Sequence, residues 1–237
     1  MTSAPPPTLA SLLRDTLLEG SAVTRIPRCR RFTVLYSPGS ASDSVYYLES
    51  GLVKIVKGGD DEKEVLLHLV GPAEIFGEDS VLNGGARTAS AEVVSEASIA
   101  IIPKDAFLSF CDRQPGGWRL VAEQASRRTR HLEQKLELFI VRDVEYRVLY
   151  YLAELAEALG VPQPDGRRAL GFSQGEIACL VGATRETTST TLNALARRGL
   201  VELGRRRLLV AEPQLLRAHA NNRKRSQPSL GRAAAQV

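Results

Sequence analysis

The sequence predicts an α+β protein with a β-rich amino-terminal domain, a long central helix and a helical carboxy-terminal domain. Short runs rich in β-branched and aromatic residues, separated by Gly, Pro, Ser and Asp, fill residues 26–102. Residues 118–159 contain neither Pro nor Gly and are much longer than an average helix of about 11–12 residues. Residues 173–199 predict two short helices joined by a turn of small residues. The 237 residues are enough for two domains that each bury a core.

Residues 1–20 are expected to form a tail followed by a short helix. Residues 1–8 are rich in Pro and are predicted to be disordered. Residues 9–20 place leucines at helical spacing, and Gly20 ends the predicted helix. The start of the chain lacks the layout of a signal peptide, and no stretch approaches the roughly 20 apolar residues of a membrane span. We therefore expect a cytoplasmic protein that makes no membrane contact.

Residues 21–117 are predicted to form an antiparallel sandwich or barrel. Turn signals such as Pro38-Gly39 and Gly71-Pro72 separate strand-like runs, which are FTVLY, VYYLES, LVKIV, EVLLHLV and ASIAIIP. Several short strands at regular spacing are typical of these folds. A short helix over residues 106–111 is expected to follow and to end before Pro115.

Residues 118–160 are predicted to form one long helix that pairs with a second copy of the chain. Apolar residues recur as in the seam of a coiled coil, at Val121, Ala125, Leu132, Leu136 and Phe139. A lone globular domain does not need such a helix, so we expect a homodimer. The seam has a polar gap at Arg128 and Thr129. An arginine on a seam is costly unless an anion meets it, and that anion could be a glutamate of the partner or a ligand.

Residues 161–220 are predicted to form a winged helix-turn-helix. Ser173 and Glu176 fit a capping box that opens the first helix, whose inward residues are Ile177, Leu180 and Val181. Gly182-Ala183 make the turn, Thr184 caps the second helix, and Gly199 ends it. The second helix is expected to turn one set of residues toward the core, namely Thr187, Thr191, Leu192 and Leu195. Residues 200–204 and 208–210 predict a two-stranded wing with arginines at its tip.

The first residues of the second helix in a helix-turn-helix reach base edges in the major groove. Here these are Arg185, Glu186, Ser189 and Thr190, of which Arg185 suits guanine and Glu186 suits cytosine. Basic residues of the helix end and the wing are expected to contact phosphates, and they are Arg197, Arg198, Arg205, Arg206 and Arg207. The predicted DNA-binding set also includes Ser173, Gln174, Thr184 and Thr187. The alternative is that Arg185 and Glu186 pair with each other on the helix surface.

Charge is distributed unevenly along the chain. Residues 161–237 carry 13 Lys and Arg and 5 Asp and Glu, a net +8, which leaves −4 for the first 160 residues. A basic end joined to an acidic remainder indicates that one domain meets a polyanion such as double-stranded DNA. A solvated basic face is the alternative. Residues 221–237 are expected to be a disordered basic tail.

The sequence lacks the motifs of common catalytic and metal sites. Cys29, Cys111 and Cys179 are far apart and form no CxxC pair, so neither a zinc site nor an iron–sulfur cluster is expected. Paired carboxylates, a nucleophile elbow and a phosphate-binding loop are absent. We therefore expect no catalytic residues, no metal and no enzymatic activity. A signalling scaffold that binds a protein is the main rival to a DNA-binding regulator.

The order of elements over residues 20–212 resembles the CRP/FNR family of bacterial transcription regulators. The segment TRETTSTTLNALARRGLV is similar to the recognition helix of that family, and residues 45–56 (VYYLESGLVKIV) are similar to its β-roll. Phe76-Gly77-Glu78 and residues 86–91 (ARTASA) resemble its cyclic-nucleotide phosphate-binding cassette. The resemblance implies a cyclic-nucleotide-binding-like β-roll (jelly roll), a long dimerisation helix and a carboxy-terminal winged helix-turn-helix. It also implies a homodimer on a pseudo-palindrome with GTGA-like half-sites, acting as an activator through RNA polymerase.

The same resemblance implies an effector site. Glu78 would accept a hydrogen bond from a ribose 2′-hydroxyl, and Arg87, with Thr88, would pair with a cyclic phosphate, for which a guanidinium fork is suited. The predicted effector-binding residues are Phe76, Gly77, Glu78, Arg87, Thr88, Arg128 and Glu133. No resident cofactor is expected beyond an effector such as cyclic AMP.

The chain departs from the cyclic-AMP receptors in two places. Leu132-Glu133 stand where those proteins have a Thr-Ser pair that contacts adenine, while Arg128 and Glu133 are similar to the 2-oxoglutarate-sensing nitrogen-control branch. A cyclic nucleotide, another small anion such as 2-oxoglutarate, and an empty pocket all remain open. Thr190 replaces a second base-reading arginine, so the operator is expected to differ at the position that this arginine reads.

Overall fold

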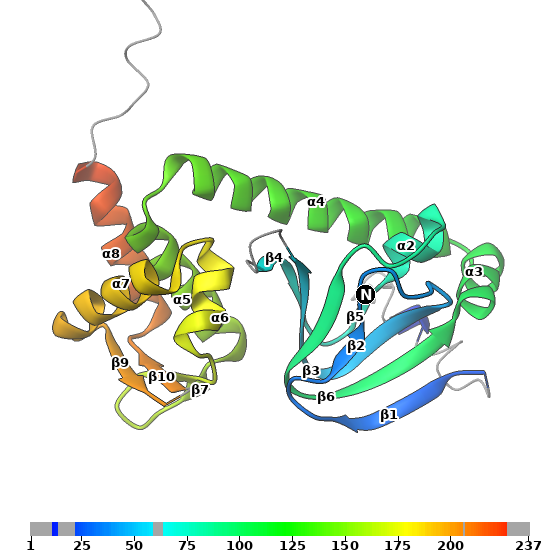
Figure 1. The fold of residues 1–237 in the computed structure, drawn as a ribbon, viewed down its shortest axis with the longest axis horizontal. Helices are drawn as coiled ribbons and strands as arrows, with labels where there is room; N and C mark the ends of the chain where they lie inside the picture. Colours follow the sequence, from blue (N-terminus) through cyan, green and yellow to red (C-terminus); the bar gives the residue numbers. More distant parts are fainter. Residues whose placement is uncertain (1–10, 14–21, 59–63, 206, 227–237) are drawn as a thin grey trace, which may run out of the picture. The chain divides into compact units, whose positions relative to one another are not determined.

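The computed structural model describes residues 11–13, 22–58, 64–205 and 207–226 (Figure 1). The chain separates into two compact units, residues 1–134 and residues 135–237. The first unit is built on a β-sheet with helices packed against it, and the second combines helices with a smaller sheet. The predicted α+β class is confirmed.

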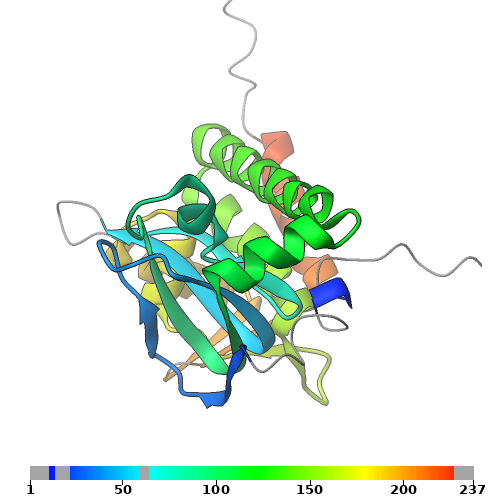
Figure 2. The ribbon, with the colours of Figure 1, turned by 90° about the vertical axis from the view of Figure 1, so that its right-hand side faces the viewer.

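The first unit is built on a six-stranded antiparallel sheet. Its strands are β1 (Thr24–Cys29), β2 (Val34–Tyr36), β3 (Ser44–Gly58), β4 (Glu64–Val70), β5 (Glu74–Phe76) and β6 (Ser90–Pro103). The order is β1-β6-β3-β4, with β2 paired to β6 and β5 paired to β3. β3 and β6 run side by side over most of their lengths, and three register shifts interrupt their ladder (Figures 1 and 2). Because such bulges bend strands, the long pair curves around a core, as a β-roll requires.

Side chains of β3 alternate between two hydrophobic clusters, as the period of two in a strand dictates. Val45 and Tyr47 join a cluster with Phe107 of α3 (Lys104–Arg113) and Leu120 of α4 (Gly117–Val141). Tyr46 and its neighbours on the other face join a second cluster inside the roll. The helix predicted over residues 106–111 is confirmed, and it is longer at both ends.

The amino-terminal segment is described only in part. Residues 11–13 are helical, and Leu13 is fully buried in the cluster beside α3. Residues 1–8 and the remainder of the helix predicted over residues 9–20 lie outside the described residues.

The single helix predicted from residue 118 to residue 160 is wrong. The structure has two helices, α4 and α5 (Val144–Leu159), separated at Arg142 and Asp143. Asp143 has an extended backbone, and its side chain accepts a hydrogen bond from Tyr146 N at 2.8 Å, which makes it the N-cap of α5. The cap starts a new helix without any Pro or Gly, which explains why the absence of these residues misled the prediction.

The predicted seam is also divided among different environments. Val121 is buried in the core of the first unit, so it is not available to a partner. Phe139 packs inside the second unit, to which it belongs, because a Cβ at Gly182 would lie 2.7 Å from its ring. Leu132 and Leu136 are exposed.

The second unit continues with two short strands, the helix-turn-helix and the wing. Its elements after α5 are β7 (Val161–Pro162), β8 (Arg168–Leu170), α6 (Gln174–Val181), α7 (Arg185–Arg197), β9 (Val201–Gly204), β10 (Arg207–Val210) and α8 (Pro213–Ser226). The sheet has the order β7-β8-β10-β9. The predicted hairpin of β9 and β10 is therefore part of a four-stranded sheet. Strands β7 and β8 have only two and three residues, which is too short for their pattern in the sequence to predict them.

Helix α8 packs along α5 and completes the second unit. Leu216 and Ala220 of α8 are buried, and Arg217 forms ion pairs with Glu154 at 2.8 Å and with Glu157. The helix extends to Ser226, so the prediction of a disordered tail from residue 221 is wrong for its first six residues. Residues 227–237 of that tail lie outside the described residues.

Candidate effector-binding and DNA-binding sites

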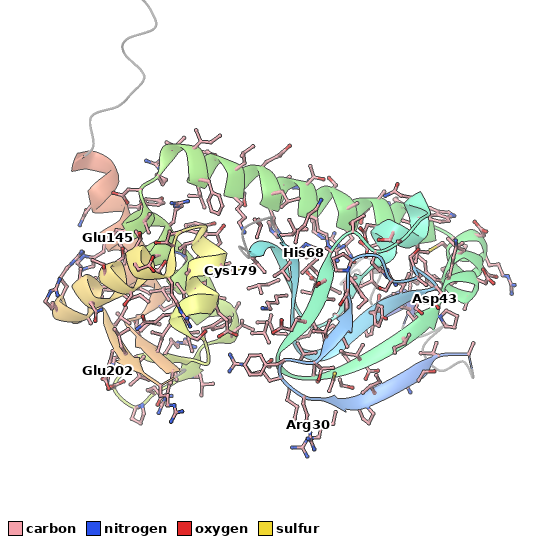
Figure 3. All side chains as sticks on the ribbon, in the orientation of Figure 1. Arg30, Asp43, His68, Glu145, Cys179 and Glu202 are labelled. Atoms are coloured by element: carbon pink, nitrogen blue, oxygen red, sulfur yellow. The ribbon has the colours of Figure 1, made fainter. Side chains whose placement is uncertain are left out.

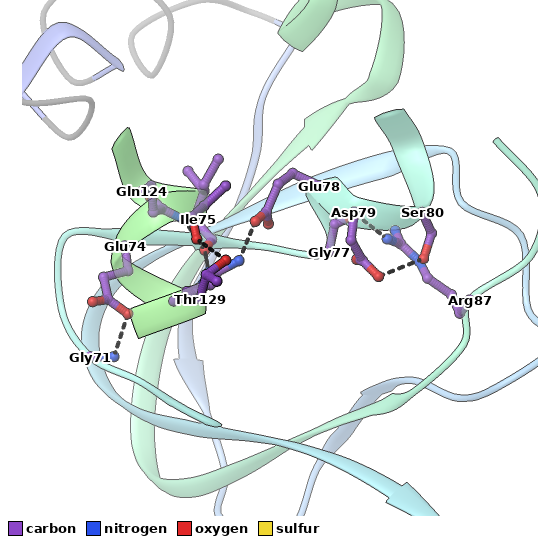
Figure 4. A network of polar contacts seen from close by, with 12 residues as sticks. Gly71, Glu74, Ile75, Gly77, Glu78, Asp79, Ser80, Arg87, Gln124 and Thr129 are labelled. Carbon is purple, nitrogen blue, oxygen red and sulfur yellow. Dashed lines mark hydrogen bonds and ion pairs between the residues drawn. The ribbon is translucent and has the colours of Figure 1, made fainter. Parts of the chain in front are cut away.

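Glu78 forms an ion pair with Arg128 in the first unit, and the Glu78 side chain is buried (Glu78 is labelled in Figure 4). Glu78 is the first residue of α2 (Glu78–Asn83), and Arg128 of α4 donates to its Oε1 and to the Ile75 carbonyl. Burial raises the pKa of Glu78, and the charge of Arg128 opposes that shift. The second carboxylate oxygen, Oε2, is buried and has no partner among the described residues. It is an acceptor able to receive one more hydrogen bond.

Arg87 lies buried close to this pair. Its two terminal nitrogens donate to the backbone carbonyls of Gly77 and Ser44. Its guanidinium carbon lies 4.5 Å from the ring centroid of Tyr36 and 5.7 Å from that of Tyr46, both cation–π distances. Its Nε is buried and has no partner within the described part of the chain. The guanidinium is therefore fixed by its two terminal nitrogens, and its Nε–H remains available as a donor.

Gly77 links the two groups because it directly precedes Glu78 in the chain and its carbonyl accepts a hydrogen bond from Arg87 (Figure 4). Its φ of 77° is left-handed, and a Cβ there would lie 2.7 Å from Arg87 Nη1. Both the backbone conformation and the approach of Arg87 therefore require glycine.

The structure brings four of the seven predicted effector residues together, and these are Gly77, Glu78, Arg87 and Arg128. Phe76 is fully buried and stacks on Tyr46 at 5.1 Å, so it supports the site from the core. Thr88 and Glu133 are exposed. The sequence analysis expected Arg128 to pair with a glutamate of a partner or with a ligand. In the structure Arg128 pairs instead with Glu78 of the same chain.

Two supporting residues were missed by the sequence analysis. Tyr36 covers the Arg87 guanidinium, and burial together with the nearby Asp79 carboxylate raises the pKa of its hydroxyl. Gln124 donates to the Ile75 carbonyl at 3.0 Å, one helical turn before Arg128 donates to the same oxygen. The four-residue spacing of Gln124 and Arg128 was the available signal, because it places both on one face of α4.

The helix-turn-helix is fixed by the caps that the sequence predicted. Ser173 N donates to Glu176 Oε2 at 2.7 Å, and Glu176 N donates to Ser173 Oγ at 3.2 Å, which completes the capping box of α6. Gly182 makes the turn with a φ of 60°. Thr184 caps α7 by accepting from Thr187 N at 3.2 Å.

Helix α7 buries one stripe and exposes another. Thr188, Leu192 and Leu195 are fully buried, whereas Arg185 and Glu186 are exposed. The prediction that Leu192 and Leu195 face the core is confirmed, but the prediction for Thr187 is wrong, because Thr187 is exposed with its hydroxyl 2.9 Å from that of Thr184. Thr188 takes the inward position instead, and Thr191 is half-buried.

The alternative of a surface pair between Arg185 and Glu186 is not found among the ion pairs and hydrogen bonds of the described residues. The Arg185 guanidinium instead lies over Gly175, where a Cβ would be 3.4 Å from Nη2. Exposed polar residues at the amino end of a capped helix are what base reading in a major groove requires. Gln174 is half-buried at the start of α6, and Ser189 and Thr190 lie on the outer side of α7.

The arginines predicted to contact phosphates differ in their surroundings. Arg198 donates to Glu145 at 2.6 Å, and its Nη2 lies 3.2 Å from His219 Nδ1, so it ties α7 to α5 and α8 (Glu145 is labelled in Figure 3). Arg207 donates to Gln163 at 3.1 Å. Arg197 and Arg205 are exposed, and Arg206 lies outside the described residues.

Comparisons with known proteins match two regions of the chain. The cyclic nucleotide-binding domain family matches residues 28–114, and the Crp-like helix-turn-helix domain family matches residues 146–219. A CRP-like cAMP-activated global transcriptional regulator of Mycobacterium tuberculosis is 33% identical over 187 residues, which cover 78% of this chain and 84% of that protein. The chain belongs to the CRP/FNR family of transcription regulators.

Other CRP/FNR relatives extend the comparison. A global nitrogen regulator of Synechococcus elongatus is 26% identical over 211 residues, which cover 88% of this chain and 95% of the relative. A solved structure of a CRP-family regulator from Thermus thermophilus has a TM-score of 0.74 at 26% identity, covering 83% of this chain and 97% of that one. These relatives are transcription regulators and not enzymes.

The two family matches cover residues of both candidate sites. The first includes Glu78 and Arg87, and the second includes α6, α7 and the wing. Among the helices that the structure describes, none is long and apolar enough to cross a membrane. In the same residues, no group of three or more His, Cys, Asp or Glu side chains is placed to hold a metal ion.

Proposed function

We propose that this regulator acts as a homodimer on pseudo-palindromic DNA with GTGA-like half-sites and is controlled by a cyclic nucleotide, with cyclic AMP as the first candidate. The observation that carries the effector assignment is the pair of unsatisfied buried atoms, Glu78 Oε2 and Arg87 Nε. Buried polar groups without partners are rare, and they often mark the place of a ligand. The 33% identical relative named as cAMP-activated supports the same assignment.

The chemistry of the two groups fits a cyclic nucleotide. Glu78 accepts from a ribose 2′-hydroxyl, and Arg87 donates to the negatively charged cyclic phosphate. Arg128 already pairs with Glu78, so ribose binding shares or displaces that contact. Since Arg128 belongs to α4, the effector alters a contact of the helix that we assign to the dimer.

The second candidate effector is 2-oxoglutarate. Arg87 and Arg128 place two guanidinium groups near one site, and a dicarboxylate would need both. In that case Arg128 leaves Glu78 for a carboxylate of the ligand. The similarity to a global nitrogen regulator favours this candidate less strongly, because it rests on 26% identity.

The homodimer is supported by the exposed side of α4. Leu132, Leu136 and Ile140 follow one another at helical spacing and are 44%, 61% and 74% exposed. Large apolar side chains in a continuous row along a helix are typical of an interface. A second copy of α4 covers them in the proposed dimer, with half-sites about one helical turn of DNA apart.

DNA recognition is assigned to the exposed residues of α7. Arg185 reads guanine and Glu186 reads cytosine of the half-site, while Arg197 and the wing arginines contact phosphates. Arg198 contributes less than the sequence suggested because Glu145 already pairs with it. RNA polymerase is the proposed protein partner at the promoter.

Thermal unfolding of the full chain tests the effector assignment. Cyclic AMP at about 100 times its dissociation constant adds about 2.7 kcal/mol to the stability of the native state. At about 2–4 °C per kcal/mol, the unfolding midpoint should rise by about 5–11 °C. Arg87→Lys keeps the charge but loses the fork and should abolish this rise, whereas the exposed control Arg130→Lys should retain it.

The two candidates give different outcomes in this experiment. A rise with 2-oxoglutarate and none with cyclic AMP would select the second candidate. An unfolding midpoint that rises with neither ligand contradicts both effector assignments and leaves the family membership unaffected.

A further inference from the structure

A polar stripe runs along the exposed face of α7 beyond the residues already assigned to DNA. Glu186, Thr190, Asn193 and Arg197 follow at intervals of four, three and four residues, which places them on one side of a helix. All four are exposed, and the opposite side carries the buried Thr188, Leu192 and Leu195. The face that presents Glu186 to a groove therefore presents Asn193 to the same groove.

The stripe contains a shallow, open depression lined by Thr190, Asn193, Ala196 and Arg197. Ala196 contributes a small side chain to this lining, and Arg197 contributes a positive charge. A base edge flanked by its negatively charged phosphate would meet both polar side chains and a positive charge there. Asn193 lies eight residues after Arg185, or about 12 Å along the helix. Its target therefore differs from the base that Arg185 reads.

The Asn193 side chain is held in place by its own helix. Its Nδ2 donates to the Ser189 carbonyl at 2.9 Å and lies 3.5 Å from Ser189 Oγ. An amide nitrogen carries two hydrogens, so one donor and the Oδ1 acceptor remain for another group. Adenine presents the complement, the N7 acceptor beside the N6 donor, and asparagine suits it bidentately. Thr190, one turn earlier, offers a methyl group that suits the methyl of thymine.

We propose that Asn193 and Thr190 read an A·T base pair, with the Asn193 amide on adenine and the Thr190 methyl group against a thymine methyl group. The inference rests on the proposed DNA recognition by α7 and adds a specificity position to it. Cytosine offers only a donor to Asn193, and guanine offers only acceptors, so neither pairs with both atoms of the amide.

Selection of DNA from a library with randomised half-sites tests the assignment, using the full chain with and without cyclic AMP. The wild type should select an A·T pair at one position besides the GTGA-like bases. Asn193→Ala should remove that preference, a loss of about 5- to 150-fold in discrimination, and leave the bases read by Arg185 unchanged. Asn193→Asp keeps only acceptors, so the preference should move toward cytosine.

Thr191→Ala is the matched control. Thr191 donates to the Thr187 carbonyl at 2.8 Å, a contact of the same kind on the same helix but outside the stripe. The base preferences that Thr191→Ala selects from the library should equal those of the wild type. The proposal is overturned if Asn193→Ala leaves every preference unchanged, if it weakens binding equally for all bases, or if Thr191→Ala has the same effect. A wild type that selects no base at any position instead overturns the proposed function, which separates the two failures.

Discussion

Replacing Gly182 by alanine should destabilise the chain more than replacing Gly199 by alanine. Both glycines follow a helix of the second unit in left-handed conformations, with φ of 60° and 72°. A Cβ at Gly182 would lie 2.7 Å from Phe139 Cε2, whereas a Cβ at Gly199 would meet no atom within 4 Å. Either alanine costs about 1–2 kcal/mol in the backbone. Only Gly182→Ala adds overpacking, which costs about 1–3 kcal/mol.

The assay is the thermal unfolding midpoint of the two single variants. At about 2–4 °C per kcal/mol, Gly182→Ala should unfold about 2–12 °C below Gly199→Ala. In a Phe139→Ala background the ring is absent, so the extra cost at Gly182 should disappear and the double-mutant cycle should show coupling. Equal midpoints of the two glycine variants would refute the reasoning. So would an extra cost that persists without the ring, because the contact with Phe139 would then not be its source.

Three further perturbations probe the rest of the molecule. Arg185→Ala should cost about 1–3 kcal/mol of binding to the operator and little on random DNA in fluorescence anisotropy, and an equal loss on both contradicts base reading. Leu136→Glu should weaken dimer association at least about tenfold in sedimentation equilibrium, because it would bury a charge in the interface. Glu137→Gln lies outside the apolar row and should leave association unchanged. If neither variant changes association, this face of α4 is not the interface. Burial raises the pKa of Glu78 above its ordinary 4.5, so the folded state binds the proton of this carboxyl more tightly than the unfolded state. The stability that comes from this tighter proton binding is present below about pH 4.5 and is lost as the pH rises through the raised pKa. Glu78→Gln stays neutral, so its unfolding midpoint should rise relative to that of the wild type as the pH increases through the raised pKa. A difference in midpoint that does not vary with pH contradicts this.

Local signals in the sequence predicted the helix-turn-helix well. The capping box at Ser173, the cap at Thr184 and the turn at Gly182 depend on residues at most three positions apart, so a local pattern contains all the necessary contacts. The break between α4 and α5 has a signal of the same kind in Asp143. The absence of Pro and Gly indicates one continuous helix, whereas a capping aspartate indicates the start of a new one, and here the capping aspartate is correct.

The partner of Arg128 could not be predicted in the same way. Glu78 lies 50 residues earlier, and only the folding of α2 against α4 brings the two charges together. The charge on the seam was visible in the sequence, but the sequence does not state whether the anion belongs to a partner, a ligand or the same chain. The inward placement predicted for Thr187 of α7 failed for another reason. Threonine is neither clearly apolar nor clearly polar, so spacing alone did not distinguish Thr187 from Thr188.

The packing of α8 has a practical consequence for anyone who isolates the DNA-binding part of this protein. Fragments designed from the helix-turn-helix pattern would end after the wing, at Val210 or soon after. Such a fragment would uncover the side of α5 that Leu216 and Ala220 cover, and it would remove Arg217 from Glu154 and Glu157. A minimal fragment should therefore begin at or before Asp143, which caps α5, and retain α8 through Ser226. Affinity tags belong beyond that residue.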